Sequence, residues 1–147
     1  MAEAINTNTL MRQLFKTDNL DRFLQDHEEQ LKAPDFCSLL KTLCEEKKLS
    51  TAQVIEHAQI ERTYGYQLLS GTRRPSRDKV LQLAFGAGLS VADAQKLLRA
   101  AGKSPLYPKL KRDAVILYGL HKRFSILAVQ EMLADCGLTM LGELRNE

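Results

Sequence analysis

Short stretches with apolar residues three and four positions apart follow one another along this chain. Several of them begin just after a serine, namely Ser50, Ser76, Ser90 and Ser125. An α-helix places residues with this spacing on one face. A serine at the start of a helix accepts a hydrogen bond from a backbone N–H that has no partner within the helix. No long stretch alternates between apolar and polar residues, as a half-buried strand would. The pattern therefore predicts an all-α protein built of short helices.

The composition favours the same class and limits the setting. Tryptophan is absent and aromatic residues make up 6% of the chain, so Leu, Ile, Val and Ala must form most of the core. No apolar run approaches the roughly 18 residues of a membrane span, and residues 1–9 lack the order of a signal peptide. Cys37, Cys44 and Cys136 are odd in number without Cys-x-x-Cys spacing. We expect reduced thiols that pack as small apolar residues in a cytoplasmic protein.

Two breaks divide the chain into three parts. Ala33-Pro34-Asp35 interrupts the first helical pattern, because the residue before proline is pushed out of the helical region. Gly102 to Pro108 contains glycine, serine and two prolines, which is typical of a connector. We therefore expect an acidic N-terminal helical arm over residues 1–33, a helical domain over 34–101 and a C-terminal helical extension over 102–147.

Within these parts the apolar spacing and the caps predict the helices. The Leu-Ser pairs at 49–50 and 89–90 are interpreted as a capping device that was used twice, and we expect no internal repeat. Tyr107, Tyr118 and Phe124 are expected in the core. The predicted helices cover about 10–15, 18–31, 35–47, 51–58, 61–70, 109–121 and 125–136, with two more that start after Ser76 and Ser90.

Charge is unevenly distributed. The net charge of +3 is small, but Met1 to Asp35 holds four basic and seven acidic residues. Lys96 to Arg123 holds eight basic residues and one acidic residue. This asymmetry indicates an acidic arm and a basic surface towards the C-terminus, although a solvated helix face would give the same count.

Two short helices, 51–58 and the helix that starts near Glu61, are joined by a tight turn inside a bundle of short helices. This is the outline of a helix-turn-helix, whose second helix enters the major groove of DNA. The residues extend the likeness. Leu49-Ser50, Val54-Ile55, Ile60, Leu68, Gly71, Arg73-Arg74-Pro75-Ser76, Leu83-Ala84 and Gly88-Leu89-Ser90 together resemble the Xre/Cro repressor-type helix-turn-helix family, without a gap from Leu49 to about Asp93.

The resemblance implies a phage-repressor-like fold of five helices over 34–101, flanked by the arm and the extension. It also implies a function, which is sequence-specific binding of double-stranded DNA by a transcriptional regulator, a repressor that acts as a homodimer. The C-terminal helices would form the dimer interface or complete one larger domain. Arginine can donate two hydrogen bonds to guanine and glutamine can pair with adenine, whereas basic side chains near the backbone supply salt-dependent affinity. The implied base contacts are Arg62, Thr63, Tyr66 and Gln67, and the implied phosphate contacts are Thr51, Arg73, Arg74, Arg77 and Lys79.

Three residues depart from the family pattern. Gln59 stands where the family usually has glycine, so the turn must adopt its geometry with a side chain present. Gly65 replaces a branched apolar residue inside the recognition helix, and we expect Tyr64 to tilt inward and fill the space. Glu61 places a negative charge at the start of that helix, which suits the helix dipole but repels phosphate.

A catalytic role finds no support in the sequence. His27, His57 and His121 lack the spacing of metal ligands, and no Gly-Lys-Ser/Thr follows Gly86-Ala87-Gly88 as a phosphate loop requires. We expect no enzyme activity, no metal and no cofactor. The alternative function is a non-catalytic interaction adaptor that keeps the helix-turn-helix fold and binds a protein partner through the acidic arm.

Overall fold

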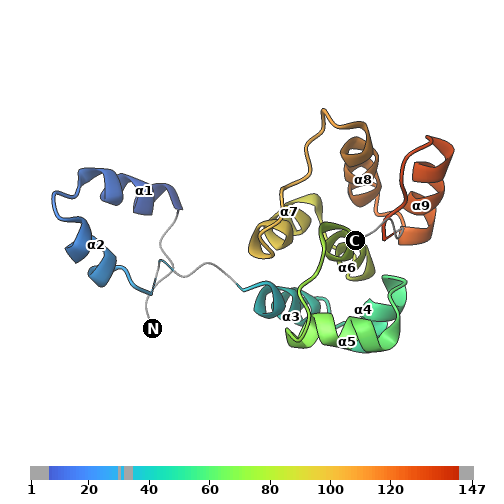
Figure 1. Cartoon of the computed structure of the whole chain (residues 1–147), viewed down its shortest axis with the longest axis horizontal. Helices are drawn as coiled ribbons and strands as arrows, with labels where there is room; N and C mark the ends of the chain where they lie inside the picture. The colour runs from blue at the N-terminus through green and yellow to red at the C-terminus, as the bar shows by residue number, and fades with distance from the viewer. Residues whose placement is uncertain (1–6, 30, 32–34, 143–147) are drawn as a thin grey trace. The chain divides into compact units, whose positions relative to one another are not determined.

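The computed structural model of the chain describes residues 7–29, 31 and 35–142 (Figure 1). All regular elements within these ranges are α-helices, which confirms the predicted all-α class. The chain divides into two compact units, Met1–Pro34 and Asp35–Glu147. The first unit corresponds to the predicted arm. The second holds both the predicted helix-turn-helix domain and the C-terminal extension.

The N-terminal unit contains α1 (Thr7–Lys16) and α2 (Leu20–Asp26). The Asn19 side chain caps α2, and Phe23 is buried and stacks on the His27 ring with centroids 4.2 Å apart. The same ring lies within hydrogen-bond distance of Gln13 Oε1, at 3.0 Å, which ties α2 to α1. The helix predicted over 18–31 ends early, at Asp26, and the expected boundary at residues 33–34 lies outside the described residues.

Five helices of the second unit follow the predicted boundaries closely. Their caps are Asp35, Ser50, Glu61, Ser76 and Ser90, each of which accepts a hydrogen bond from a backbone N–H of the first turn. The helices are α3 (Phe36–Glu46), α4 (Thr51–His57), α5 (Arg62–Ser70), α6 (Arg77–Gly86) and α7 (Val91–Ala100).

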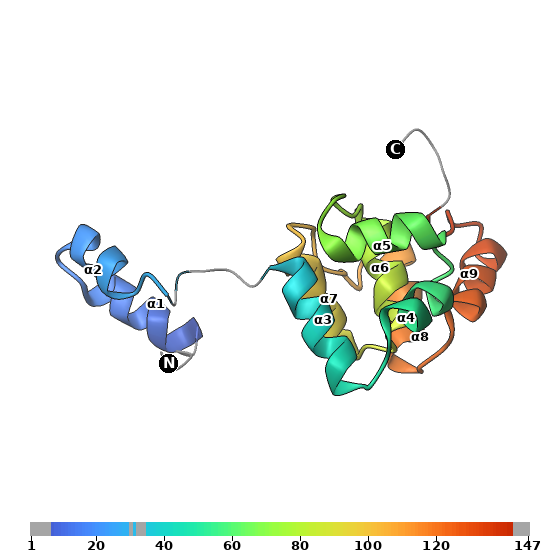
Figure 2. The same cartoon turned by 90° about the horizontal axis from the view of Figure 1, so that it is seen from below.

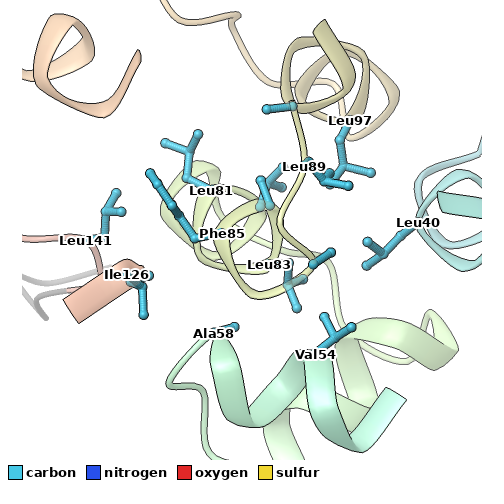
Figure 3. Packing of buried hydrophobic residues seen from close by; sticks show 14 of the residues in the cluster. Leu40, Val54, Ala58, Leu81, Leu83, Phe85, Leu89, Leu97, Ile126 and Leu141 are labelled. Carbon is cyan, nitrogen blue, oxygen red and sulfur yellow. The ribbon is translucent and has the colours of Figure 1, made fainter. Parts of the chain in front are cut away.

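Helix α6 forms the centre of the second unit in both views (Figures 1 and 2). Its residues from Val80 to Gly86 are all buried, because other helices cover it on several sides. Leu83 points towards α4, where Val54 and Ala58 lie, whereas Leu81 and Phe85 point towards Ile126 and Leu141 (Figure 3). One continuous apolar core therefore joins the helix-turn-helix to the C-terminal segment.

The C-terminal segment contains α8 (Lys111–His121) and α9 (Ile126–Asp135), which pack on α7 and α6. It completes one larger helical unit with α3 to α7. The expectation that Tyr107, Tyr118 and Phe124 belong to the core is wrong, since these side chains are 52%, 50% and 37% exposed. Apolar character predicts a tendency to be buried, but it does not tell which face of a helix another helix covers.

The second unit contains an internal repeat. Residues 77–107 and 112–142 align without a gap, each residue with the one 35 positions later. Helices α8 and α9 end 35 positions after α6 and α7, and both pairs have a glycine with positive φ after the second helix, at Gly102 and Gly137. Gln95 forms two hydrogen bonds with the backbone of Leu106, at 2.9 and 2.7 Å. Its counterpart Gln130 forms the same two bonds with Leu141, at 2.8 and 2.7 Å.

The two repeats exchange equivalent bonds. Arg77 of the first repeat binds Asp113 of the second at 2.9 Å, and Arg112 of the second binds Asp78 of the first at 3.0 Å. Because each arginine pairs with the aspartate of the other repeat, the two helix pairs are related by an approximate two-fold axis. Arg123 donates to the carbonyl of Gly88, its own counterpart, at 2.9 Å.

The expectation of no internal repeat is therefore wrong. Eight of the 31 aligned positions are identical, so the similarity is weak in the sequence. They include residues that cap helices, turn the chain or join the repeats, together with apolar residues of the helices: Arg77/Arg112, Asp78/Asp113, Val80/Val115, Ser90/Ser125, Gln95/Gln130, Leu98/Leu133, Gly102/Gly137 and Leu106/Leu141.

The three cysteines were expected to be reduced and to pack as small apolar residues. Cys37, Cys44 and Cys136 are free thiols, and burial raises the pKa of Cys37 and Cys44. Cys44 is buried and Cys37 half-buried, as small core residues would be, but Cys136 at the end of α9 is exposed.

Within the described residues no helix has the length and apolar content to cross a membrane.

Candidate nucleic-acid interface

The turn between α4 and α5 is fixed by two buried apolar residues, Ala58 and Ile60, on either side of Gln59. Gln59 has a φ of 58°, the left-handed conformation that glycine adopts most easily, so the turn does take its usual geometry with a side chain present. The side-chain amide of Gln59 donates to the Glu56 carbonyl at 3.3 Å. The buried Gln82 of α6 donates to the Ala58 carbonyl at 3.2 Å and joins the turn to the central helix.

Helix α5 lies close against α4 at Gly65. A Cβ atom on this glycine would lie 2.6 to 2.9 Å from three side-chain carbons of Ile55, so any larger residue requires the helices to move. Ile55 therefore fills the space that a branched side chain would occupy. The expectation that Tyr64 fills it is wrong, although the half-buried Tyr64 does pack against the core elsewhere.

The outer face of α5 carries the side chains that were predicted to read bases. Arg62, Thr63 and Tyr66 are exposed, and Gln67 is half-buried. The guanidinium carbon of Arg62 lies 5.8 Å from the ring centre of Tyr66, one turn along the helix. The structure therefore brings these four residues together on one short helix.

Tyr64 organises the cations beside α5. Its ring centre lies 5.1 Å from the guanidinium carbon of Arg73 and 5.7 Å from Lys79 Nζ, distances at which a cation is attracted to an aromatic ring. Lys79 also donates to Gln82 Oε1 at 2.9 Å. The basic loop after α5 and the first turn of α6 are thus held next to the recognition helix. The sequence predicted only a packing role for Tyr64, and nothing in its pattern pointed to these contacts with cations.

The remaining predicted phosphate contacts differ in their surroundings. Thr51 is exposed beside a capping box, in which Ser50 and Gln53 bond each other's backbone N–H, and Arg74 is exposed in the basic loop. Arg77 is already engaged, since it donates to both carboxylate oxygens of Asp113 and to two backbone carbonyls of residues 104 and 105. With four hydrogen bonds inside the protein Arg77 joins the repeats, and its guanidinium is not available for a phosphate as the predicted contact requires.

Glu61 caps the recognition helix. Its carboxylate accepts from the backbone N–H groups of Tyr64 and Thr63, at 2.8 and 3.0 Å, and these bonds lower the pKa of Glu61. The carboxylate therefore occupies donors that a phosphate would otherwise use. For contacts with a ligand α5 therefore offers its exposed side chains rather than these two N–H groups.

Two short helices joined by a left-handed turn, with polar and basic side chains on the second, define a helix-turn-helix domain. Residues 35–99 match the model of a family described as "Helix-turn-helix domain". The match begins at the cap of α3 and ends within the last turn of α7. A domain of this class implies a DNA-binding regulator in general terms. Comparison with curated proteins and with solved structures gave no match.

Proposed function

We propose that this chain is a sequence-specific transcription regulator of the Xre/Cro type, a repressor that binds double-stranded DNA as a homodimer. The observation that carries the proposal is the exposed row of Arg62, Thr63 and Tyr66 on α5, beside the cations that Tyr64 holds. Side chains on the second helix of a helix-turn-helix read base edges in the major groove, and cations at its edge bind the phosphates.

The proposed contacts divide into two groups. Arg62, Thr63, Tyr66 and Gln67 read bases, with Arg62 suited to guanine and Gln67 to adenine. A single domain of this size buries little DNA surface, so tight binding needs two half-sites and hence a two-fold operator. The phosphate contacts are Thr51, Arg73, Arg74 and Lys79.

Selection of bound DNA from a random pool, followed by fluorescence anisotropy over a salt series, tests this function. We expect an enriched palindromic site and an affinity that falls steeply with salt. Arg62→Ala should lower specific affinity by about tenfold or more, since a good bidentate base contact contributes about 1–3 kcal/mol. Lys96→Ala is the matched control. Lys96 is also an exposed cation, but it lies on α7, outside the helix pair α4 and α5, and α7 packs on α3, α6 and α8. No enriched site, a flat salt dependence and equal affinities for the two variants would contradict the proposal.

A second candidate is a non-catalytic adaptor that binds a protein through the N-terminal unit. Its support is the apolar surface of α1 and α2, where Phe15 is 76% and Leu20 is 55% exposed next to Asp18 and Asp21. Exposed apolar side chains with polar neighbours mark interaction sites. Affinity capture with the full chain and with Phe15→Asp decides between the functions. A partner lost with Phe15→Asp, together with no DNA binding by either chain, would favour the adaptor.

A further inference from the structure

The repeat shows which surface of the C-terminal helices differs from its counterpart. Leu81 and Leu98 of the first repeat are fully buried, and so are their counterparts Ile116 and Leu133. These positions form the core that both repeats share. At other positions burial is lost: Leu83 is 0% exposed but its counterpart Tyr118 is 50% exposed. Leu89 and Phe124 differ in the same way, at 1% and 37%.

The cause lies in the helices that cover the first repeat. Helices α4 and α3 pack over α6 and α7, and Leu83 points towards α4 (Figure 3). The equivalent positions of the second repeat are Tyr118 on α8 and Phe124 in the α8–α9 turn. Leu127 lies in the first turn of α9, and its counterpart Ala92 is exposed in the first repeat as well. We call the surface formed by Tyr118, Phe124 and Leu127 the outer face. A helix pair without covering helices would be expected to carry polar residues there, because exposed apolar area carries a free-energy cost.

The centre of the outer face instead carries larger and more aromatic side chains than the first repeat does at the equivalent positions. Tyr118 replaces a leucine, and its ring packs edge to face against Phe124 with centroids 5.9 Å apart. Leu127, which is 63% exposed, replaces Ala92. Polar side chains lie beside this centre, where His121 and the cation Lys122 stand in place of Gly86 and Ala87. An apolar, aromatic centre with a polar rim is the anatomy of a protein interface.

His121, at the edge of the outer face, excludes a covering helix that packs as closely as α4 packs on α6. In the first repeat α4 comes so close to Gly86 that a Cβ atom there would clash with the backbone of Val54 and with Ala58. His121 stands at the equivalent place on α8, so a helix cannot approach the outer face as α4 approaches α6. Another mode of association is required.

A groove beside the outer face allows a second copy of the chain to associate in a different way. This groove, of about 510 Å³, lies between the end of α4 and the α8–α9 turn. Leu127 and Phe124 line this groove, and because both are exposed each can serve as an apolar knob for a second copy. A knob next to a hollow is self-complementary under a two-fold rotation, because each copy inserts its knob into the hollow of the other. The other apolar side chains that line the groove are Phe85, Leu89, Leu120 and Ile126.

Charge on the same groove also fits a second copy better than a partner of one sign. Glu56 lines one side and Arg123 the other, and Lys122 is adjacent. A two-fold rotation brings the acidic side of one copy towards the basic side of the other. We propose that the outer face of α8–α9, centred on Tyr118, Phe124 and Leu127, is the surface through which two copies of this chain associate. The proposal rests on the homodimer of the proposed function and names its interface.

Sedimentation velocity on the full chain without DNA, over a concentration series, tests this interface. The wild type should show a monomer–dimer equilibrium. Leu127→Asp should weaken association by about tenfold to a hundredfold, the factor expected for losing one buried leucine. Tyr118→Asp is a second variant on the same face. Leu110→Asp is the matched control, because Leu110 is 55% exposed at the start of α8, where an aspartate suits a helix cap.

Circular dichroism shows whether each variant remains folded. A wild type that stays monomeric at the highest soluble concentration would overturn the proposal. So would folded Leu127→Asp and Tyr118→Asp chains that associate as the wild type does. Failure of the proposed function is distinguishable: a dimer that both variants weaken, and that binds no DNA, supports this interface and refutes DNA binding. A monomer that binds DNA refutes this interface and supports DNA binding.

Discussion

The reciprocal bonds between the repeats predict that two distant aspartates stabilise the protein to the same extent. Asp113 is 2% exposed and accepts three hydrogen bonds, two from Arg77 and one from the Tyr107 N–H at 2.9 Å. Its counterpart Asp78 accepts two from Arg112 and one from the Gly142 N–H at 3.0 Å.

Removing one partner of a buried ion pair costs about 3–5 kcal/mol, because the other charge is left unpaired. The side chains of Arg77 and Arg112 are 24% and 25% exposed, and each keeps bonds to two backbone carbonyls. The lower end of that range therefore applies. We expect Asp113→Ala and Asp78→Ala each to lower the free energy of unfolding by about 3 kcal/mol.

Urea denaturation followed by circular dichroism, together with thermal melts, measures both effects. For a unit of this size about 3 kcal/mol corresponds to a fall in Tm of about 10 °C. Glu131→Ala, which removes an exposed carboxylate of α9, is the control and should change stability by less than about 0.5 kcal/mol. If one aspartate costs about 3 kcal/mol and the other less than about 1 kcal/mol, the two sets of bonds are not energetically equivalent and the reasoning fails.

Two further predictions concern acid stability and the helix-turn-helix core. Burial disfavours the charged form of Asp78, but its bonds from Arg112 and Gly142 outweigh this and lower its pKa on folding. Its contribution to stability is therefore complete above about pH 4 and is lost as the pH falls through the folded pKa, so urea midpoints of Asp78→Asn should depend less on pH below about pH 4 than those of the wild type. Gly65→Ala should destabilise the protein by about 1–2 kcal/mol despite the better helix propensity of alanine, because its Cβ meets Ile55. In a double-mutant cycle measured by urea denaturation, Ile55→Ala should remove this penalty; additive losses would show that the contact is not the cause.

The parts of the fold that depend on neighbouring residues were predictable from the sequence. Ser50, Ser76, Ser90 and Ser125 each cap a helix in the structure, as the spacing of their apolar neighbours indicated. A cap and a helical face are set within a few residues of each other, so a single sequence contains the necessary information.

The parts that depend on distant residues were not predictable in this way. Arg77 resembles the other cations of its loop, and only the position of Asp113, 36 residues away, shows that it joins two helix pairs. The exposure of Tyr118 likewise depends on which helices cover α8, and its own sequence neighbours do not contain that information. At the candidate site, the exposure of Arg62, Thr63 and Tyr66 follows from helical periodicity, whereas the role of Tyr64 depends on Arg73 and Lys79.

Hydrogen bonds made by Gln82 and Asp78 of α6 connect the C-terminal segment to the turn before the recognition helix. The buried amide of Gln82 accepts from Lys79 and donates to the last carbonyl before the α4–α5 turn, and the neighbouring Asp78 holds the backbone of Gly142. Helix α6, which positions the turn before α5, is thus also bonded to the backbone of Gly142. Loosening these hydrogen bonds would act on the proposed DNA-binding surface without altering any side chain on it, so regulation of this surface need not involve α5 itself.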